Sequence, residues 1–99
     1  MITLLPQTPE DTLAEKKRQR QAAVDAITVT TSTGKTFDGD ETSQGRMARA
    51  ILTAQIAGIV ETTWVLANNI TTLITLAELQ EALALSVQAM GAMWADPYA

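Results

Sequence analysis

The sequence predicts a small single α+β domain in which one helix is followed by two units of β-hairpin and helix (α-ββ-α-ββ-α). Short β-branched stretches occur in two pairs, and turn-forming residues join the members of each pair. Longer stretches with apolar residues at helical spacing precede the first pair, separate the two pairs and follow the second. The chain has 99 residues, which is enough for one domain with a modest core.

The first helix is predicted to begin at Pro9 and to end near Ala26. Proline suits the first helical position, Thr8 can cap the helix, and acidic residues follow in the first turn. Residues 16–20 form a basic run inside this helix. The run is interpreted as a solvated face that pairs with nearby acidic residues, and the alternative is a basic stripe that meets an acidic partner in an assembly.

The first hairpin is predicted from two β-branched strands, residues 27–31 and residues 36–37. Gly34 lies in the turn between them, where a positive φ angle favours glycine. Asp40 is expected to cap the second helix, which is predicted to end at Gly58. The acidic residues around this cap do not predict a calcium site, because a calcium loop needs oxygen ligands at alternate positions over about twelve residues.

The second helix is predicted to be amphipathic. Residues at spacings of three and four form its polar face, namely Thr42, Arg46, Arg49 and Thr53. Its apolar side contains Met47, Ala48, Ile51, Leu52 and Ile56. The two arginines are interpreted as surface residues that balance the acidic turn, or as arginines of an interface.

The second hairpin is predicted from strands at residues 62–67 and 70–73, with Asn68-Asn69 as a two-residue turn. Residues 75–78 form a capping-box pattern, in which a threonine and a glutamate three positions later cap the start of a helix. The third helix is therefore predicted over residues 76–94.

Residues 1–8 are predicted to form an extended arm, residues 9–95 the domain, and residues 96–99 a C-terminal tail. The third helix is apolar on more than one side, which is hard to bury within one small chain, so we expect subunit contacts and a homo-oligomer. Apolar residues of the arm are expected to dock on a neighbouring subunit, and the alternative is a frayed terminus. The candidate interface residues are Ile2, Leu4, Leu5, Leu83, Val87, Met90, Met93 and Trp94.

The composition argues against several classes of function. The sequence contains neither histidine nor cysteine, which removes the commonest general base, thiol nucleophiles and the commonest metal ligands. We therefore expect no enzyme activity, no cofactor and no metal. No binding to nucleic acid is expected at a net charge of −4, because such binding depends on Lys and Arg at the phosphates. The sequence predicts no membrane span and no signal peptide.

Three motifs follow one another along the chain. Residues 17–23 have the pattern Lys-Arg-x-x-x-Ala-Ala, and residues 34–47 contain a run of glycine, phenylalanine and aspartate before a helix. Residues 64–78 contain a tryptophan strand, an asparagine turn and a helix start. In this order, the motifs resemble an uncharacterised domain family found in tail, tail-fibre and fibre-assembly proteins of tailed bacteriophages and prophages.

The resemblance implies a structural or accessory subunit of a bacteriophage tail, tail fibre or baseplate, which contacts other tail proteins. Such a subunit is assembled in the host cytoplasm and located in the tail of the virion. In many relatives the domain ends a longer protein, whereas here it fills almost the whole chain, which favours a small accessory subunit. The alternatives are a tail-fibre assembly chaperone that is absent from the mature virion, and a small phage protein that binds a host factor. The resemblance implies no catalytic residues.

Overall fold

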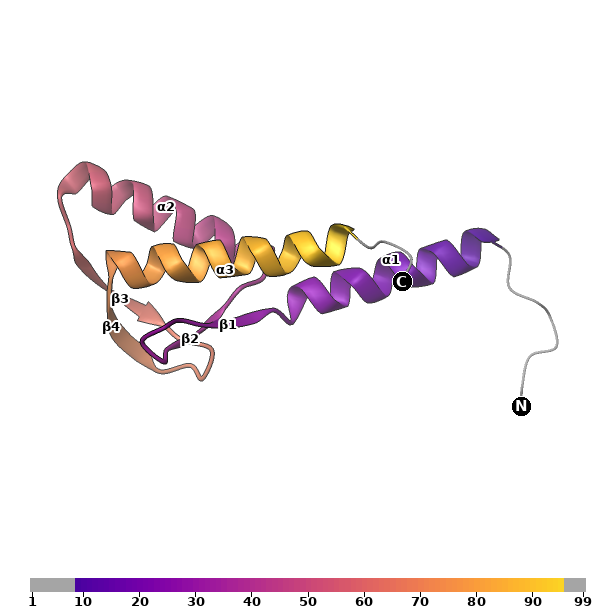
Figure 1. The fold of residues 1–99 in the computed structure, drawn as a ribbon, viewed down its shortest axis with the longest axis horizontal. Coiled ribbons are helices and arrows are strands. Elements are labelled where there is room, and N and C mark those ends of the chain that lie inside the picture. The colour runs from indigo at the N-terminus through magenta and orange to yellow at the C-terminus, as the bar shows by residue number, and fades with distance from the viewer. Residues whose placement is uncertain (1–8, 96–99) are drawn as a thin grey trace.

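The structure is a computed structural model that describes residues 9–95 (Figure 1). Its elements, in chain order, are α1 (Pro9–Asp25), β1 (Thr28–Thr30), β2 (Thr36–Asp38), α2 (Glu41–Ala57), β3 (Glu61–Val65), β4 (Thr71–Thr75) and α3 (Leu76–Ala95). The predicted α+β plan of one helix and two hairpin–helix units is confirmed.

The first hairpin pairs β1 with β2 in antiparallel register, with Val29 opposite Phe37. Both of these side chains are buried, while their neighbours along β1 are exposed. Gly34 has a φ angle of 86°, so the turn uses glycine where a side chain would be strained, as the sequence predicts.

The second hairpin pairs β3 with β4, and its turn is longer than the predicted Asn68-Asn69 pair. The Leu66 N–H donates to the Ile70 carbonyl oxygen at 3.0 Å, which leaves residues 67–69 as the loop. Asn69 takes a positive φ angle of 65°, which asparagine tolerates better than most residues. The Asn68 carboxamide oxygen accepts a hydrogen bond from the Ile70 N–H at 3.0 Å, and this bond favours the longer turn.

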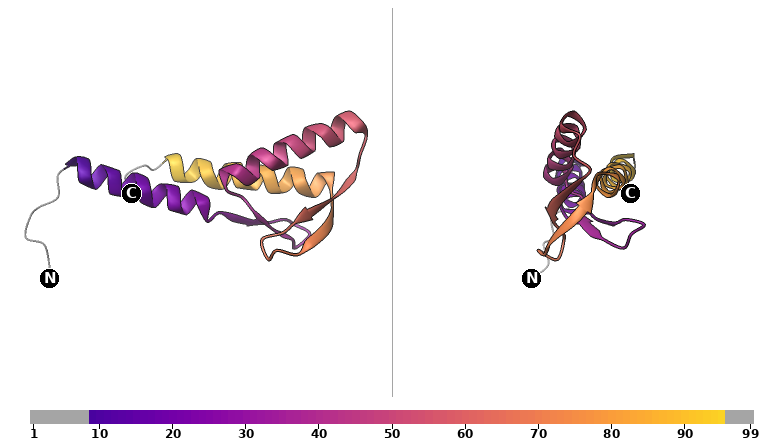
Figure 2. Two further views of the ribbon diagram at one scale, coloured as in Figure 1. Left: turned by 180° about the vertical axis from the view of Figure 1, so that it is seen from behind. Right: turned by 90° about the vertical axis from the view of Figure 1, so that its left-hand side faces the viewer.

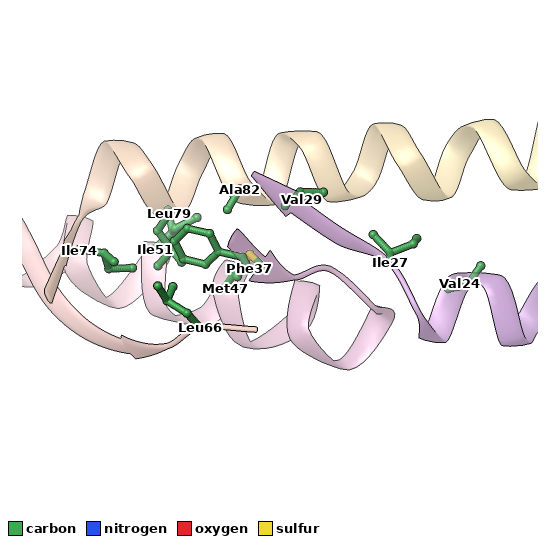
Figure 3. Close-up of a cluster of buried hydrophobic side chains, with 10 residues drawn as sticks. All are labelled: Val24, Ile27, Val29, Phe37, Met47, Ile51, Leu66, Ile74, Leu79 and Ala82. Atoms are coloured by element: carbon green, nitrogen blue, oxygen red, sulfur yellow. The ribbon is translucent and has the colours of Figure 1, made fainter. Parts of the chain in front are cut away.

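The core lies where α2, α3 and the two hairpins meet (Figure 3). Two of its residues, Ile27 and Leu66, lie in the links just outside the helices and strands. Phe37, Met47, Ile74 and Leu79 are the largest fully buried apolar side chains. The complete buried cluster is Val24, Ile27, Val29, Phe37, Met47, Ile51, Leu66, Ile74, Leu79 and Ala82.

Helix α1 projects away from this core, past the C-terminal half of α3 (Figures 1 and 2). The radius of gyration is 17.6 Å, whereas a compact domain of 100 residues has about 13 Å. Only Val24, near the end of α1, is fully buried in this helix among the side chains that the structure describes. Most of α1 is therefore a charged helix exposed to solvent, which agrees with the interpretation of residues 16–20 as a solvated face.

The predicted apolar side of α2 is only partly buried. Met47 and Ile51 face the core, but Ala48 and Leu52 are exposed and Ile56 is 79% exposed. The residues that α2 buries are Gln44, Met47, Ile51 and Ala54. The rest of the apolar side stays exposed because the core is small. Helix α3 packs on one narrow stripe of α2, and no other described element covers the adjacent apolar side chains.

Helices α2 and α3 begin or end at the predicted capping residues. Gly58 has a left-handed φ angle of 69° and ends α2. The Thr75 hydroxyl accepts from the Glu78 N–H at 3.1 Å, and the Glu78 carboxylate accepts from the Thr75 N–H at 2.9 Å, so the capping box is confirmed. Asp40 occupies the N-cap of α2, but its carboxylate accepts a hydrogen bond from the Ser43 hydroxyl instead of from a backbone N–H.

Candidate interaction surfaces

The turn of the first hairpin is bound to the first turns of α3 by two glutamates. Glu78 accepts hydrogen bonds from the Thr33 hydroxyl at 2.6 Å and from the Lys35 ammonium at 2.5 Å. Glu81 accepts from the Ser32 N–H at 2.7 Å and from the Ser32 hydroxyl at 2.9 Å. We call these residues, Ser32, Thr33, Lys35, Glu78 and Glu81, the turn clasp.

Within the clasp, Glu78 has its pKa lowered to about 2. The hydrogen bond from Lys35 contributes most, followed by those from the Thr33 hydroxyl and the Thr75 N–H, because each of them stabilises the ionised carboxylate. A carboxylate with this pKa and these donors stays charged near neutral pH and is a poor proton acceptor. The clasp therefore holds the hairpin on α3 and does not resemble a catalytic base.

A second buried polar contact joins the start of α2 to the middle of α3. The Gln44 carboxamide nitrogen donates to the Ser86 carbonyl oxygen of α3 at 3.5 Å and to the Gly39 carbonyl oxygen at 2.9 Å. The fully buried Ser86 hydroxyl donates to the Ala82 carbonyl oxygen within α3 at 2.7 Å. A Cβ atom at Gly39 would lie only 2.5 Å from Ser86 Oγ and 2.7 Å from Ile27 Cγ2. The glycine between the two acidic residues is thus required by close packing, which sequence reasoning did not predict.

The residues predicted for a subunit interface divide into three groups. On α3, Leu83, Met90 and Met93 are partly buried against the core of their own chain. Val87 is 48% exposed and Trp94 is 44% exposed. The remaining three, Ile2, Leu4 and Leu5, lie outside the described residues.

Helix α1 covers part of the apolar surface of α3. The guanidinium carbon of Arg20 lies 4.9 Å from the centre of the Trp94 ring, in a cation–π contact between the two helices. With α2 and β1 also packed against it, α3 is covered on several sides within one chain. An apolar third helix therefore does not by itself require a second subunit.

Exposed apolar side chains gather instead at the end of α2. Leu52 and Ile56 lie on the side of this helix that faces away from the core, and Ile59 and Val60 follow in the link to β3. We call these four residues the apolar flank. Ile56 and Val60 are 79% and 69% exposed, so the flank is well placed to contact another molecule.

Residues 9–95 contain neither a metal-binding cluster of acidic side chains nor a membrane-spanning helix. No group of three or more Asp or Glu side chains is arranged to hold a metal ion in this part of the chain. None of the helices there is long and apolar enough to cross a membrane.

A family model described as a domain of unknown function, DUF4376, matches residues 7–96. The chain belongs to the DUF4376 family. The match covers all the elements of the fold, so the DUF4376 domain corresponds to the complete helix and two hairpin–helix units. Neither the comparison with curated proteins nor the comparison with solved structures gave a match.

Proposed function

We propose that this DUF4376 protein is a structural or accessory subunit of a bacteriophage tail, tail fibre or baseplate, and that it acts through protein–protein contacts. The apolar flank carries the proposal. Removal of apolar surface from water is favourable by about 25 cal/mol per Å², so the exposed side chains of Leu52, Ile56, Ile59 and Val60 favour a partner that covers them. The motifs at residues 17–23, 34–47 and 64–78 support a tail protein as the assembly.

The polar clusters of the fold support the same interpretation. The donors and acceptors of the turn clasp are occupied by one another, and Gln44 and Ser86 bond to backbone carbonyl groups. These groups have structural roles in the domain, which leaves its outer surface as the region available for function. We therefore propose binding, and not catalysis, as the activity of the chain.

Mass spectrometry of purified phage particles tests the tail assignment. A tagged chain is produced during phage growth, and the particles are compared with the cell extract. We expect the chain in the particles, in contact with a tail protein after cross-linking. A chain that co-purifies with a fibre protein but is missing from particles would instead be an assembly chaperone.

The role of the flank is tested with a charged variant and a matched control. Ile56→Asp places a carboxylate within the apolar flank, whereas Gln55→Asp places one at the neighbouring exposed position of α2. We expect Ile56→Asp to reduce incorporation into particles and Gln55→Asp to leave it unchanged. Equal incorporation of both variants would contradict a role for the flank.

A further inference from the structure

Strand β3 has one edge without a partner in the part of the chain that the structure describes. At its two ends, the backbones of Val60 and Leu66 hydrogen-bond toward the β4 side, at 2.9 and 3.0 Å. Backbone groups alternate in direction along an antiparallel strand. The N–H and C=O groups of Glu61, Thr63 and Val65 therefore point away from β4, toward an edge where another strand can be added.

Ala67 is the next residue whose backbone points away from β4, and its N–H group already has a hydrogen-bond partner. The Ala67 N–H points to the same side and donates to the Thr36 carbonyl oxygen of the first hairpin at 3.0 Å. The two hairpins diverge beyond this bond, since β2 pairs only with β1 and β3 pairs only with β4. The unpaired edge of β3 is thus one wall of an open groove.

Helix α2 forms the other wall of this groove. A hollow of about 430 Å³ lies between Ser43 and Arg46 of α2 and residues 63–65 of β3. A second hollow of about 280 Å³ continues along the helix, between Arg49 and Thr53 on one side and Thr62 on the other. We call these residues together the α2–β3 groove.

The helical wall of the groove is positively charged, although the chain as a whole is acidic. Arg46 and Arg49 are exposed, and neither forms an ion pair within residues 9–95. The guanidinium group of Arg49 lies over Gly45, because a Cβ atom there would be 3.3 Å from Arg49 Nη1. Asp38 is the acidic side chain in the lining of the first hollow.

The geometry points to a binding site for an extended acidic peptide segment of a partner protein, which adds to β3 as a third strand of the second hairpin. Backbone hydrogen bonds to Glu61, Thr63 and Val65 would hold the segment about 4.8 Å from β3. Its acidic side chains would pair with Arg46 and Arg49 on the helical wall.

Trp64, in the lining of the first hollow, offers an aromatic surface for one apolar side chain of the same segment. The inference does not depend on a phage tail role, because it follows from the backbone direction, the hollows and the two arginines of this groove.

Nuclear magnetic resonance titration of the full chain tests the site. The probe is a blocked eight-residue peptide of alternating valine and glutamate, and the control peptide has lysine at each glutamate position. We expect the acidic peptide to shift the amide signals of Thr63 and Val65, and to bind at least tenfold more tightly than the lysine peptide. A third peptide, with proline at a central position, should bind more weakly because it lacks one backbone donor.

Two charge variants separate the groove from general electrostatic attraction. Arg46→Gln and Arg18→Gln remove the same charge from exposed positions, but Arg18 lies on α1, where it pairs with Glu15. We expect Arg46→Gln to weaken binding of the acidic peptide about tenfold and Arg18→Gln to change it less than twofold.

Four results would overturn the inference. The first is equal binding of the acidic and lysine peptides, and the second is an equal effect of the two variants. The third is a shift of the Thr63 and Val65 signals with protein concentration alone, which would mean that β3 pairs with a second copy of the chain. A peptide of residues 1–8 that outcompetes the acidic peptide would also contradict it, because the chain's own arm would then be the occupant.

Discussion

The two hairpins have the same place in their hairpin–helix units, yet their surroundings differ. The β1–β2 hairpin buries Val29 and Phe37 and has its turn fixed to α3 by the turn clasp. The β3–β4 hairpin buries Ile74 but exposes Leu73 and Val65 on its outer face, and the outer edge of β3 has no partner strand within residues 9–95. We call them the closed hairpin and the open hairpin.

The difference separates residues that stabilise the fold from residues that are available to partners. Side chains of the closed hairpin contact α3 through buried carbon atoms and through short, charged hydrogen bonds. The open hairpin lies beside the polar side of α2 and the apolar flank, where the chain has surface left for binding. Substitutions in the closed hairpin should therefore lower stability, whereas those in the open hairpin should change binding.

The largest effect is expected for Phe37→Ala in the closed hairpin. Phe37 is fully buried at the centre of the core, so its truncation should lower the free energy of unfolding by about 3–5 kcal/mol. Urea denaturation followed by circular dichroism measures the change. A loss below about 1 kcal/mol would mean that the closed hairpin does not anchor the core.

The next largest effect is expected for Gly39→Ala, at the end of the closed hairpin. The added methyl group overlaps Ser86 Oγ and Ile27 Cγ2, and overpacking of this kind costs about 1–3 kcal/mol. Gly91→Ala on α3 is the matched control, because no atom lies within 4 Å of its added Cβ. The control should raise stability by about 0.5–1 kcal/mol through helix propensity, so the two substitutions should have opposite signs in the same denaturation experiment.

A pH-dependent effect is expected from the turn clasp. The pKa of Glu78 is about 2 in the folded chain and near 4.5 when the residue is free, so the unfolded state binds the proton more readily. The stabilisation from Glu78 is fully present above about pH 4.5 and is lost as the pH falls toward 2.

Thermal unfolding between pH 2 and pH 6 measures this contribution. Glu78→Gln should flatten the dependence of the melting temperature on pH relative to the unmodified chain. An unchanged slope in Glu78→Gln would show that the clasp does not hold the closed hairpin at neutral pH.

The smallest effect on stability is expected for Leu73→Thr on the open hairpin. Leu73 is 59% exposed and lies opposite Thr63 on the outer face, so its replacement by a β-branched residue should change stability by no more than about 0.5 kcal/mol. Urea denaturation in parallel with Phe37→Ala gives the direct contrast. A loss comparable with that of Phe37→Ala would remove the distinction between the two hairpins.

Local sequence signals were sufficient to predict the order of the elements and the ends of the helices, whereas the strands of the second hairpin begin and end one or two residues from their predicted bounds. Gly34, Gly58 and the Thr75–Glu78 capping box each act through bonds or backbone angles within a few residues, so their meaning can be read from the sequence alone. The length of the second turn was predicted less well, because a side-chain bond from Asn68 selects the longer loop.

The surfaces depended on contacts between distant residues and were predicted only in part. The apolar spacing of α2 could not show that α3 covers a narrow stripe and leaves Leu52 and Ile56 exposed. Burial of Gln44 and Ser86 likewise depends on how α2 packs on α3. The α2–β3 groove also lies beyond a sequence prediction, because it forms where the hairpins diverge and brings Arg46 beside an unpaired strand edge.

Amide hydrogen exchange, measured residue by residue by nuclear magnetic resonance, tests the contrast between the hairpins most directly. In the chain alone, the amides of Phe37 and Trp64 should exchange slowly because they bond to partner strands, whereas those of Thr63 and Val65 should exchange close to the rate of an unfolded peptide. Saturation with the acidic peptide should slow Thr63 and Val65 selectively. Slow exchange of Thr63 and Val65 in the chain alone would contradict an open β3 edge and the groove built on it.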